Sequence, residues 1–410
     1  MTDSIDVVIV GGGIAGAALA SAVARDGLGV VVLEASEQYE DRVRGESMVP
    51  WGVAEARELG VEQCLLASDA RITGMWVHYD DAVPTDVTLA HPIPAGMIVP
   101  GVDGSLNLRH PEACEGLARL AISNGARVIR GVRDVLVTAG THPTVTARTV
   151  TGEQLSFAAR LVIGADGRNS TVRRQIGIDL ERHEATHMVA GVIVDGLEVE
   201  IEHDFLASND ELFMASFRQH DGQMRVYLCP GLAQKNRFAG PTGMAEFLRS
   251  ANFACLPFGE ALANANPIGP LATYPGDDTW TATPYVPGVV LVGDAAGWNT
   301  PIIGQGLSIA MRDVRLVRDA LRAGDMSPPS FRAYADERLE RMRRLRNASM
   351  VMASAMADDC DNRVARRAKF FELQETEPLM LAMLIGMFGG PENAPPEAFD
   401  GHLRELIQAA

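Results

Sequence analysis

A tight glycine cluster near the start of the chain, within the stretch "VVIVGGGIAGAALA", places the strongest constraint on the fold. Gly11, Gly13 and Gly16 satisfy the spacing G-x-G-x-x-G between an apolar run and an alanine-rich segment. Glycines at this spacing allow a sharp strand-to-helix turn whose backbone amides can approach a pyrophosphate group at the helix N-terminus. The motif therefore predicts a dinucleotide site, without saying which dinucleotide it holds.

The segments around this turn complete a βαβ unit. The apolar run at 5–10 predicts a buried parallel strand, residues 15–27 predict a helix, and residues 29–33 predict a second strand that ends at Glu34. An acidic residue about twenty positions past the glycines is the expected acceptor for the two ribose hydroxyls. Glu34 therefore predicts an unphosphorylated ribose, as in FAD or NAD rather than NADP.

Composition excludes several classes of function. The net charge of −17 opposes binding to nucleic acid and to anionic membrane surfaces. The longest apolar stretch, near residues 379–388, is too short to span a bilayer, and the N-terminus has no signal-peptide pattern. The five dispersed cysteines predict free thiols, and no metal-ligand spacing is present. We expect a cytoplasmic protein without integral membrane association, acting as a monomer or homodimer.

The remaining chain predicts a mixed α/β fold with an inserted antiparallel sheet. Alternating apolar and polar residues at 71–110 and 185–275 predict antiparallel strands with one exposed face. After residue 325 the pattern is largely helical, and we expect the arginine-rich segment "ERLERMRRLRNAS" to form a solvated helix face with Glu–Arg pairs. The predicted division is a discontinuous dinucleotide-binding domain at 1–70, 105–182 and 280–325, a β-sheet substrate domain at 71–104 and 183–279, and a helical C-terminal region at 326–410.

Two further motifs follow predicted strands. "GADGRNSTVRRQIG" carries Asp166, and "GDAAGWNTPIIGQG" carries Asp294, each just past a strand end, where open α/β sheets bind ligands. Gly304 and Gly306 flank a predicted helix start, so their backbone amides can face an electron-rich carbonyl or phosphate. Three such motifs in this order are more specific than any one of them.

Together these motifs resemble the flavoprotein aromatic hydroxylases, the single-component (group A) FAD monooxygenases of the p-hydroxybenzoate hydroxylase type. The resemblance covers residues 5 to about 325 and rests on the glycine turn, Asp166-Gly167 and Gly293-Asp294. It implies a Rossmann-like FAD-binding fold, FAD as cofactor and NAD(P)H as reductant. In such enzymes a flavin C4a-hydroperoxide, formed with O2, hydroxylates an aromatic or natural-product substrate, while the protein binds, orients and excludes water.

The resemblance also implies a set of cofactor contacts. Carried over position by position, these are Gly11, Gly13, Ile14, Ala15, Gly16, Glu34, Ala35, Arg44, Arg109, Val132, Asp166, Asp294, Pro301, Gly304, Gly306 and Leu307.

Individual roles follow from the same resemblance. The glycines approach the pyrophosphate, Glu34 holds the adenosine ribose and Asp294 binds the ribityl chain, with a helix cap as the alternative for Asp294. Arg44 lies along the cofactor, a role that Arg42 can exchange with it. Arg109 opens a helix against the cofactor.

The third motif and the Asp166 motif complete the assignment. Gly304 to Leu307 line the isoalloxazine ring, and Pro301 lies near its reactive face. Asp166 is either linked to NAD(P)H or caps a helix.

Alternatives remain open at this point. Gly297 after "GDAA" departs from the histidine common in the family and also occurs in the geranylgeranyl-reductase-like branch, so flavin-dependent reduction is one alternative. Epoxidation and Baeyer–Villiger insertion use the same oxygen chemistry, and a non-enzymatic flavin-binding scaffold is a further reading. An NAD-dependent dehydrogenase leaves the second and third motifs unexplained. Halogenation is disfavoured because no lysine precedes Lys235.

No catalytic side chain is assigned from the sequence. A phenolic substrate benefits from a base or hydrogen-bond acceptor. Candidates in the inserted β region are His78, Tyr79, His203, Arg218, His220 and Tyr227. The stretch "PLMLAMLIGMFGG" predicts a buried helix that could otherwise line an apolar substrate cavity. The expected partners are O2 and a small aromatic or apolar substrate.

Overall fold

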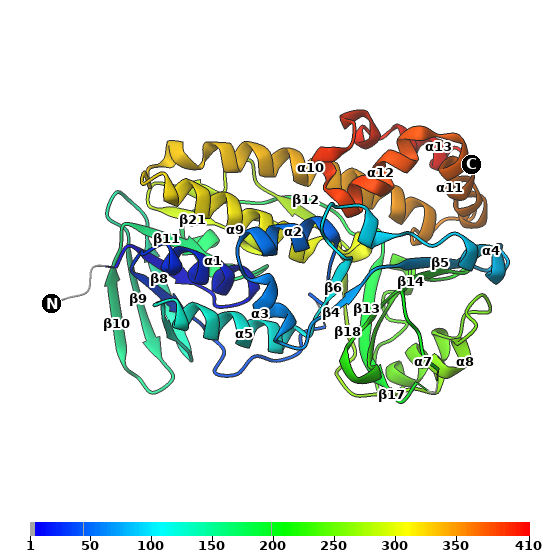
Figure 1. The fold of residues 1–410 in the computed structure, drawn as a ribbon, viewed down its shortest axis with the longest axis horizontal. Helices are drawn as coiled ribbons and strands as arrows, with labels where there is room; N and C mark the ends of the chain where they lie inside the picture. Colours follow the sequence, from blue (N-terminus) through cyan, green and yellow to red (C-terminus); the bar gives the residue numbers. More distant parts are fainter. Residues whose placement is uncertain (1–4, 44, 198) are drawn as a thin grey trace.

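Two β-sheets form the two halves of the protein, which lie left and right in Figure 1. The computed structural model describes residues 5–43, 45–197 and 199–410. The first sheet has the order β20-β21-β11-β1-β2-β7, and its neighbours are parallel except for the pair β20 and β21. In this order the strands are Tyr285–Val286, Val289–Leu291, Leu161–Gly164, Val7–Val10, Val30–Leu33 and Arg127–Ile129. The predicted Rossmann-like α/β fold is confirmed.

The first sheet is covered on both faces, which explains its unbroken apolar strands. Val7 and Ile9 of β1 pack in one core with three helices, while Val8 and Val10 pack in another core with a small antiparallel sheet. The helices are α1 (Ile14–Arg25), α5 (His110–Ser123) and α9 (Gly306–Arg322), and the antiparallel strands are β8 (Val132–Thr138), β9 (Thr144–Thr149) and β10 (Gln154–Ala158). A strand buried on both faces gains from apolar residues at every position.

The second sheet has the order β17-β13-β16-β15-β14-β5, with β18 beside β13. Its strands are Asn266–Pro267, Met188–Asp195, Met224–Cys229, Phe213–Arg218, Asp204–Ser208 and Trp76–Asp80, and β18 is Ala272–Pro275. One expectation was wrong in detail: β5 pairs with β14 in parallel. The chain after β5 forms helix α4 (Thr85–Ala90) and the 3-10 turn η1 (Ala95–Met97) where strands were predicted.

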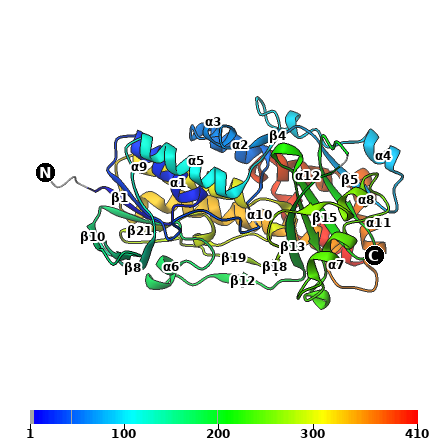
Figure 2. The same ribbon diagram turned by 90° about the horizontal axis from the view of Figure 1, so that it is seen from below.

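Helices cover the second sheet from both sides. On one face lie α7 (Gly243–Ser250) and α8 (Gly259–Ala263), which are below the sheet in Figure 1, and Figure 2 views the protein from that side. The other face packs against the C-terminal helices α10 (Arg332–Met356), α11 (Arg363–Thr376), α12 (Pro378–Gly389) and α13 (His402–Gln408). The C-terminal region therefore forms one wall of the molecule.

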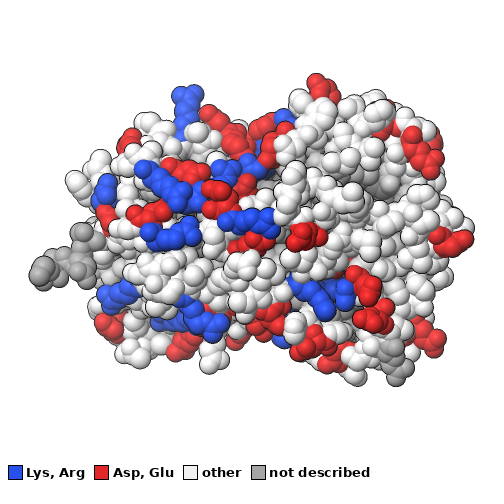
Figure 3. Space-filling view, in the orientation of Figure 1, with Lys and Arg blue, Asp and Glu red and all other residues white. Residues whose placement is uncertain are grey.

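Helix α10 runs along the top of both halves in Figure 1. The prediction of a solvated arginine face holds only for part of it. Arg344 pairs with Glu340 at 2.7 Å, and acidic and basic side chains intermingle over α9 and α10 in Figure 3. Arg338 and Arg341, however, are 1% and 3% exposed and bind the carboxylate of Asp313. Each buried arginine meets a buried acid, which the linear charge pattern does not reveal.

The remaining α-helices and β-strands lie between or beside these elements. They are β3 (Ser47–Met48), α2 (Pro50–Glu58), α3 (Glu62–Leu66), β4 (Arg71–Thr73), β6 (Ser105–Asn107), α6 (Thr171–Gln175), β12 (Glu181–His183) and β19 (Asp278–Trp280). The small sheet β3-β6-β4 draws strands from segments that the sequence assigned to different domains. The predicted domain boundaries stay a prediction.

Apolar helix α12 is partly buried. Met380, Met383 and Met387 face the core, whereas Leu381 and Ile385 are exposed. Within residues 5–43, 45–197 and 199–410, no helix combines the length and the apolar character needed to cross a bilayer. All five cysteines are free.

Candidate cofactor and substrate site

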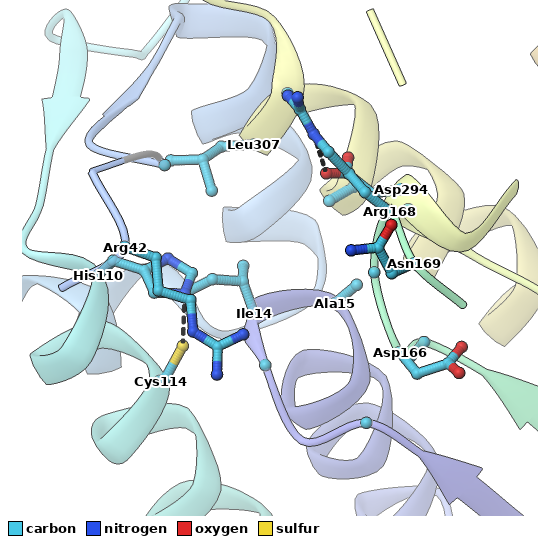
Figure 4. Close-up of a pocket in the computed structure, with 18 of the residues that line it drawn as sticks. Ile14, Ala15, Arg42, His110, Cys114, Asp166, Arg168, Asn169, Asp294 and Leu307 are labelled. Atoms are coloured by element: carbon cyan, nitrogen blue, oxygen red, sulfur yellow. Dashed lines mark hydrogen bonds and ion pairs between the residues drawn. The ribbon is translucent and has the colours of Figure 1, made fainter. Parts of the chain in front are cut away.

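A cavity of about 660 Å³ lies where the ends of the first sheet's strands meet the second sheet. It collects residues from the glycine turn, from the two other motifs and from strands of the second sheet. Of the contacts predicted from the sequence, the cavity is lined by Gly11, Gly13, Ile14, Ala15, Glu34, Ala35, Val132, Asp166, Asp294, Pro301, Gly304, Gly306 and Leu307. Three motifs far apart in the chain therefore meet at one place, as Figure 4 shows for Ile14, Ala15, Asp166, Asp294 and Leu307 with their neighbours.

The glycine turn fits a pyrophosphate group. A β-carbon on Gly13 would meet nothing within 4 Å, so the backbone there is open to the cavity. Gly11 has φ of 101°, and a β-carbon would lie 2.4 Å from the carbonyl oxygen of Ala165. Gly16 lies beneath the turn, where a β-carbon would come within 1.9 Å of the Gly11 oxygen. Helix α1 begins at Ile14 without a side-chain cap, which leaves its first amides for a ligand.

The carboxylate of Glu34 lies beside this turn. Its Oε2 accepts a hydrogen bond from the Gly12 amide at 2.6 Å, and its Oε1 accepts one from the Ser36 amide at 2.7 Å. Each carboxylate oxygen keeps a further lone pair, which a ribose hydroxyl can use. Tyr39 supports the turn from outside by donating its hydroxyl to the Gly12 carbonyl at 2.7 Å.

We expect Glu34→Ala to weaken FAD binding about tenfold or more, because the ribose hydroxyls lose their acceptor. The apoprotein should also lose roughly 1–3 kcal/mol of stability, since the amides of Gly12 and Ser36 are left without partners. Fluorescence titration with FAD and urea unfolding measure the two effects. Glu34→Gln, which keeps one carbonyl oxygen, serves as the milder control. Wild-type affinity in the alanine variant would contradict the assignment.

The turn that carries Asp294 is a 3-10 turn, η4 (Gly293–Ala296), at the end of β21. Asp294 faces the cavity, and its Oδ2 lies 3.3 Å from Nε of Arg168, as Figure 4 shows. The alternative of a helix cap does not apply to Asp294. Asp313 instead accepts the Gly293 amide at 2.9 Å.

Asp166 caps helix α6 while lining the cavity. Its carboxylate accepts hydrogen bonds from the Ser170 hydroxyl at 2.5 Å and from the amides of Thr171 and Val172 at 2.6 and 3.1 Å. These contacts are those of a helix cap, which was one of the two roles considered for Asp166 from the sequence. A link to NAD(P)H stays a prediction.

A fixed loop carries Pro301, Gly304 and Leu307. Pro301 opens the 3-10 turn η5 (Pro301–Ile303), and Gly304 follows in the left-handed region with φ of 65°. The buried side chain of Gln305 accepts from Trp51 Nε1 at 2.9 Å and donates to the carbonyls of Ile303 and Met387 at 2.9 and 3.1 Å. The loop is thus held against both α2 and α12, with its open backbone toward the cavity.

Of the other predicted contacts, Gly16 lies beneath the turn and outside the lining, and the two predicted arginines have separate outcomes. Arg44 lies outside the described residues, whereas Arg42, named as its alternative, lines the cavity. Arg109 caps α5 but is absent from the lining, and its Nε lies 3.5 Å from Glu112.

His110, the first residue of α5, is on the side of this helix that faces the cavity. His110 lines the cavity, and its Nε2 is 3.5 Å from Sγ of Cys114 (Figure 4). Burial raises the pKa of the Cys114 thiol to about 12, so it stays protonated at neutral pH. A cofactor contact by Arg109 stays a prediction.

In the second half of the cavity, only Tyr227 was among the residues singled out from the sequence. It is lined by apolar and aromatic side chains of the second sheet and the η5 turn, namely Val189, Phe213, Ala215, Phe217, Tyr227, Cys229, Tyr274 and Ile302. We call this set the substrate compartment. Strands β15 and β16 contribute every second residue, so the alternation in the sequence already separates the two faces of these strands.

Tyr227 is the candidate base that the fold brings to the cavity. Tyr79 and His203 bind each other at 2.9 Å elsewhere in the second half, and His78 binds Ser208 at 2.9 Å. His220 lies 3.1 Å from Asp69. None of these four, nor Arg218, is part of the lining among the residues that the structure describes.

A buried carboxylate meets Tyr227 at the wall of the compartment. Glu46 is 4% exposed, lines the cavity and accepts a hydrogen bond from the Tyr227 hydroxyl. Burial raises the pKa of Glu46 to about 7, although Arg225 and Tyr227 act in the opposite direction. Burial also raises the pKa of the Tyr227 hydroxyl. No motif in the sequence marks Glu46 as a site residue.

A Rossmann-like sheet with a glycine turn and an adjoining apolar compartment is typical of α/β proteins that bind a dinucleotide beside a second ligand. A family profile described as "FAD binding domain" matches residues 4–349, and the chain belongs to this family, that of the p-hydroxybenzoate-hydroxylase-type flavoprotein monooxygenases. The family predicted from the three motifs is confirmed.

The individual relatives share less than a third of their residues with this chain. Squalene monooxygenase SE1 of Panax ginseng is 28% identical over 328 residues, covering 78% of this chain and 59% of the relative. Squalene epoxidase erg1 of Aspergillus fumigatus is 28% identical over 333 residues, covering 77% of this chain and 66% of the relative. The chain thus spans less than two thirds of either relative. The crystal structure of p-nitrophenol 4-monooxygenase PnpA from Pseudomonas putida DLL-E4 has a TM-score of 0.78 at 17% identity, covering 95% of this chain and 98% of that one.

Proposed function

We propose that this protein is an FAD-dependent monooxygenase that uses NAD(P)H and O2 to oxygenate an aromatic or other apolar small molecule. The observation that carries the proposal is the continuity of the cavity. One end is a glycine-lined cradle that fits a dinucleotide, and the other is a compartment of aromatic and aliphatic side chains. Apolar walls with few polar groups are typical of small-molecule sites.

The residues of the cradle have distinct proposed tasks. Gly11 and Gly13 bring backbone to the FAD pyrophosphate, Glu34 accepts from the ribose, and Asp294 accepts from the ribityl chain. The loop from Pro301 to Leu307 lies at the join of cradle and compartment and would carry the flavin ring. When bound and reduced by NAD(P)H, FAD supplies the oxygen-activating chemistry.

The protein itself supplies binding, orientation and exclusion of water. Phe213, Phe217 and Tyr274 form a wall from which water is displaced when an apolar ligand enters. Arg168 closes the edge between cradle and compartment, with its guanidinium 5.7 Å from the ring centre of Tyr274 and 5.4 Å from that of Trp298. Tyr227 is the polar group of this wall that meets a buried acid.

Epoxidation is the second candidate reaction, favoured by the squalene epoxidases among the relatives. Hydroxylation and epoxidation place the same oxygen atom on different carbon frameworks. The nature of the substrate, an electron-rich ring or an isolated double bond, decides between them. The apolar compartment fits either framework.

We expect the purified protein to be yellow, or to become yellow with added FAD, and to oxidise NAD(P)H faster when a substrate binds. The decisive measurement uses a panel of phenols and polyenes under ¹⁸O2, with mass spectrometry of the products. One ¹⁸O atom per product molecule supports a monooxygenase, and its position distinguishes a hydroxyl group from an epoxide. A colourless protein that takes up no FAD would refute the proposal. A yellow protein that reduces substrates without incorporating oxygen would favour the reductase alternative.

A further inference from the structure

Gly297 is the point at which the sequence departs from the histidine common in the family, and the structure supplies a reason. Its φ is 114°, and a β-carbon there would lie 2.5 Å from the carbonyl oxygen of Thr279 and 2.8 Å from Cα of Trp280. Two stretches of backbone therefore touch at this position, and glycine leaves the room that they need. We call residues 277–279, on one side of this contact, the anchor segment, and residues 298–300, on the other side, the loop start.

Hydrogen bonds join the anchor segment to the loop start. The amide of Thr279 donates to the carbonyl of Trp298 at 2.8 Å, and the Trp298 amide donates back to Oγ1 of Thr279 at 3.1 Å. The indole Nε1 of Trp298 donates to Oδ1 of Asp277 at 3.1 Å. The anchor segment thus fixes Trp298, the first residue of the loop start.

Asp278 holds the other two residues of the loop start with a single oxygen atom. Its Oδ1 accepts a hydrogen bond from Nδ2 of Asn299 at 2.5 Å and one from the amide of Thr300 at 3.0 Å. Asp278 is 4% exposed, so both bonds lie away from water, and a charged acceptor makes them stronger than bonds to a neutral oxygen. Asn299 lines the cavity, and Thr300 directly precedes Pro301. A change at Asp278 is therefore transmitted to the residue proposed to lie at the flavin ring.

The far end of the same loop is held by a neutral group. Gln305 fixes that end through hydrogen bonds to α2, the η5 turn and α12. Between the two ends lie Pro301, which lines the cavity, and Gly304, whose φ is 65°. Of the two side chains that hold these ends, only Asp278 is ionisable.

We propose that Asp278 is a positioning residue of this site: through Asn299 and Thr300 it fixes Pro301 against the flavin ring and so keeps water from that part of the ring. The proposal rests on the proposed function for the presence of the flavin. Among the described residues Asp278 is not part of the cavity lining, so it acts through the loop rather than by direct contact. A shielded ring suits an oxygen-transferring flavoprotein, because exclusion of water prevents side reactions.

Protonation of Asp278 weakens this hold. Burial raises its pKa to about 6, although hydrogen bonds from Thr300 and Asn299 and the charges of Arg346 and His183 act in the opposite direction. Asp278 is therefore ionised at about pH 8 and largely neutral at about pH 5, where it is the weaker acceptor.

Other titratable or charged side chains surround the anchor segment. They are Glu184, His187, Asp358 and Arg404, which line a small cavity of about 20 Å³ beside Asp278, and Asp277 with its partner Arg182. Burial lowers the pKa of His187 to about 4, so its charge does not change between about pH 8 and about pH 5. A variant at position 278 is needed to separate Asp278 from the rest.

The first test uses the apoprotein and does not depend on FAD. Hydrogen–deuterium exchange, read by mass spectrometry, follows peptides that cover residues 298–303. We expect Asp278→Ala to speed exchange there about tenfold, because the Thr300 amide loses its acceptor and the loop start is released.

Asp204→Ala is the matched control. Asp204 is 0% exposed, and its Oδ1 likewise accepts a side-chain amide, from Asn107 at 2.8 Å, and a backbone amide, from Arg218 at 2.9 Å. These contacts join β6 to the second sheet and leave the loop untouched. We therefore expect wild-type exchange at 298–303 in this control.

The second test uses the FAD-loaded protein without NAD(P)H and measures how strongly iodide quenches the fluorescence of the bound flavin. In Asp278→Ala quenching should rise about threefold, while FAD affinity stays within about threefold of the wild type because the cradle is unchanged. In the wild type, lowering the pH from about 8 to about 5 should raise quenching to the level of Asp278→Asn. That variant keeps an acceptor oxygen without the charge, so its quenching should be intermediate and independent of pH. Asp204→Asn should keep the wild-type response to pH.

Several results would overturn the positioning role. They are unchanged exchange at 298–303 in Asp278→Ala, an equal rise in Asp204→Ala, equal iodide quenching in the wild type and Asp278→Ala, and a pH response that is absent from the wild type or persists in Asp278→Asn. If Asp278→Ala does not fold, Asp278→Asn decides both tests. A protein that takes up no FAD refutes the proposed function, whereas the exchange result still decides whether Asp278 holds the loop.

Discussion

Replacement of Gly13 by valine is expected to give a folded protein that no longer binds FAD. Gly13 has an ordinary negative φ of −70°, and its β-carbon position is free of protein atoms within 4 Å. The side chain would instead fill the part of the cavity where the backbone meets the pyrophosphate. We expect FAD affinity to fall about 100-fold, or roughly 2.8 kcal/mol.

Gly16→Val, three residues farther along the chain, is the matched comparison. Its β-carbon would lie 1.9 Å from the Gly11 carbonyl, so the turn itself must move. We expect the apoprotein to lose about 3 kcal/mol of stability as well as FAD. Urea unfolding of the apoproteins and FAD titration distinguish the two. A Gly13→Val protein that binds FAD normally would show that the cradle is not at this turn, and an unstable apoprotein would contradict the open space at the Gly13 β-carbon.

Arg338→Met is expected to be the most destabilising single change in the C-terminal region. Arg338 is 1% exposed and donates to the carbonyls of Gly293, Ala296 and Gly297 at 3.2, 3.0 and 2.8 Å. Its Nε also binds Asp313 at 2.9 Å. Methionine fills similar space but leaves these acceptors buried without donors, which costs about 3–5 kcal/mol.

The same substitution should also weaken FAD binding, because the turn that Arg338 holds carries Asp294. Thermal and urea unfolding measure the first effect, and FAD titration measures the second. Arg332→Met, on the same helix, is the control: Arg332 is 78% exposed in its side chain and lies 3.7 Å from Asp336, so a change below about 0.5 kcal/mol is expected. Equal stability of the two variants would refute the structural role of Arg338.

Local patterns predicted the cofactor half of the protein well. The apolar run at β1, the glycine spacing and the acid at Glu34 are all set within one βαβ unit, so neighbouring residues determine them. Asp294 also follows its strand directly. Each of these predictions depends on the geometry at the end of a single strand. That geometry is determined by residues that are close together in the sequence.

Predictions that depend on long-range packing were poorer. The parallel pairing of β5 with β14 joins segments more than a hundred residues apart, and no local signal distinguishes it from antiparallel pairing. Arg109 directly precedes α5 as expected, whereas His110, which the sequence did not single out, lines the cavity. Glu46 could not be singled out from the sequence, because its contacts are with Arg225 and Tyr227 on a strand that is distant in the chain.

Helix α10 contacts both halves of the protein, although the predicted domain boundaries place it in a separate C-terminal region. Near its start, Arg338 fastens the turn of the cofactor half, and farther along Leu345 and Met352 belong to the core beneath the substrate sheet. Because a helix is stiff over this length, a displacement of one end of α10 also displaces the other end. Removal of residues 326–410 would uncover apolar side chains of both cores, because Phe331 and Tyr334 pack in one core and Leu345 and Met352 pack in the other. We therefore expect the two halves to unfold in one cooperative transition.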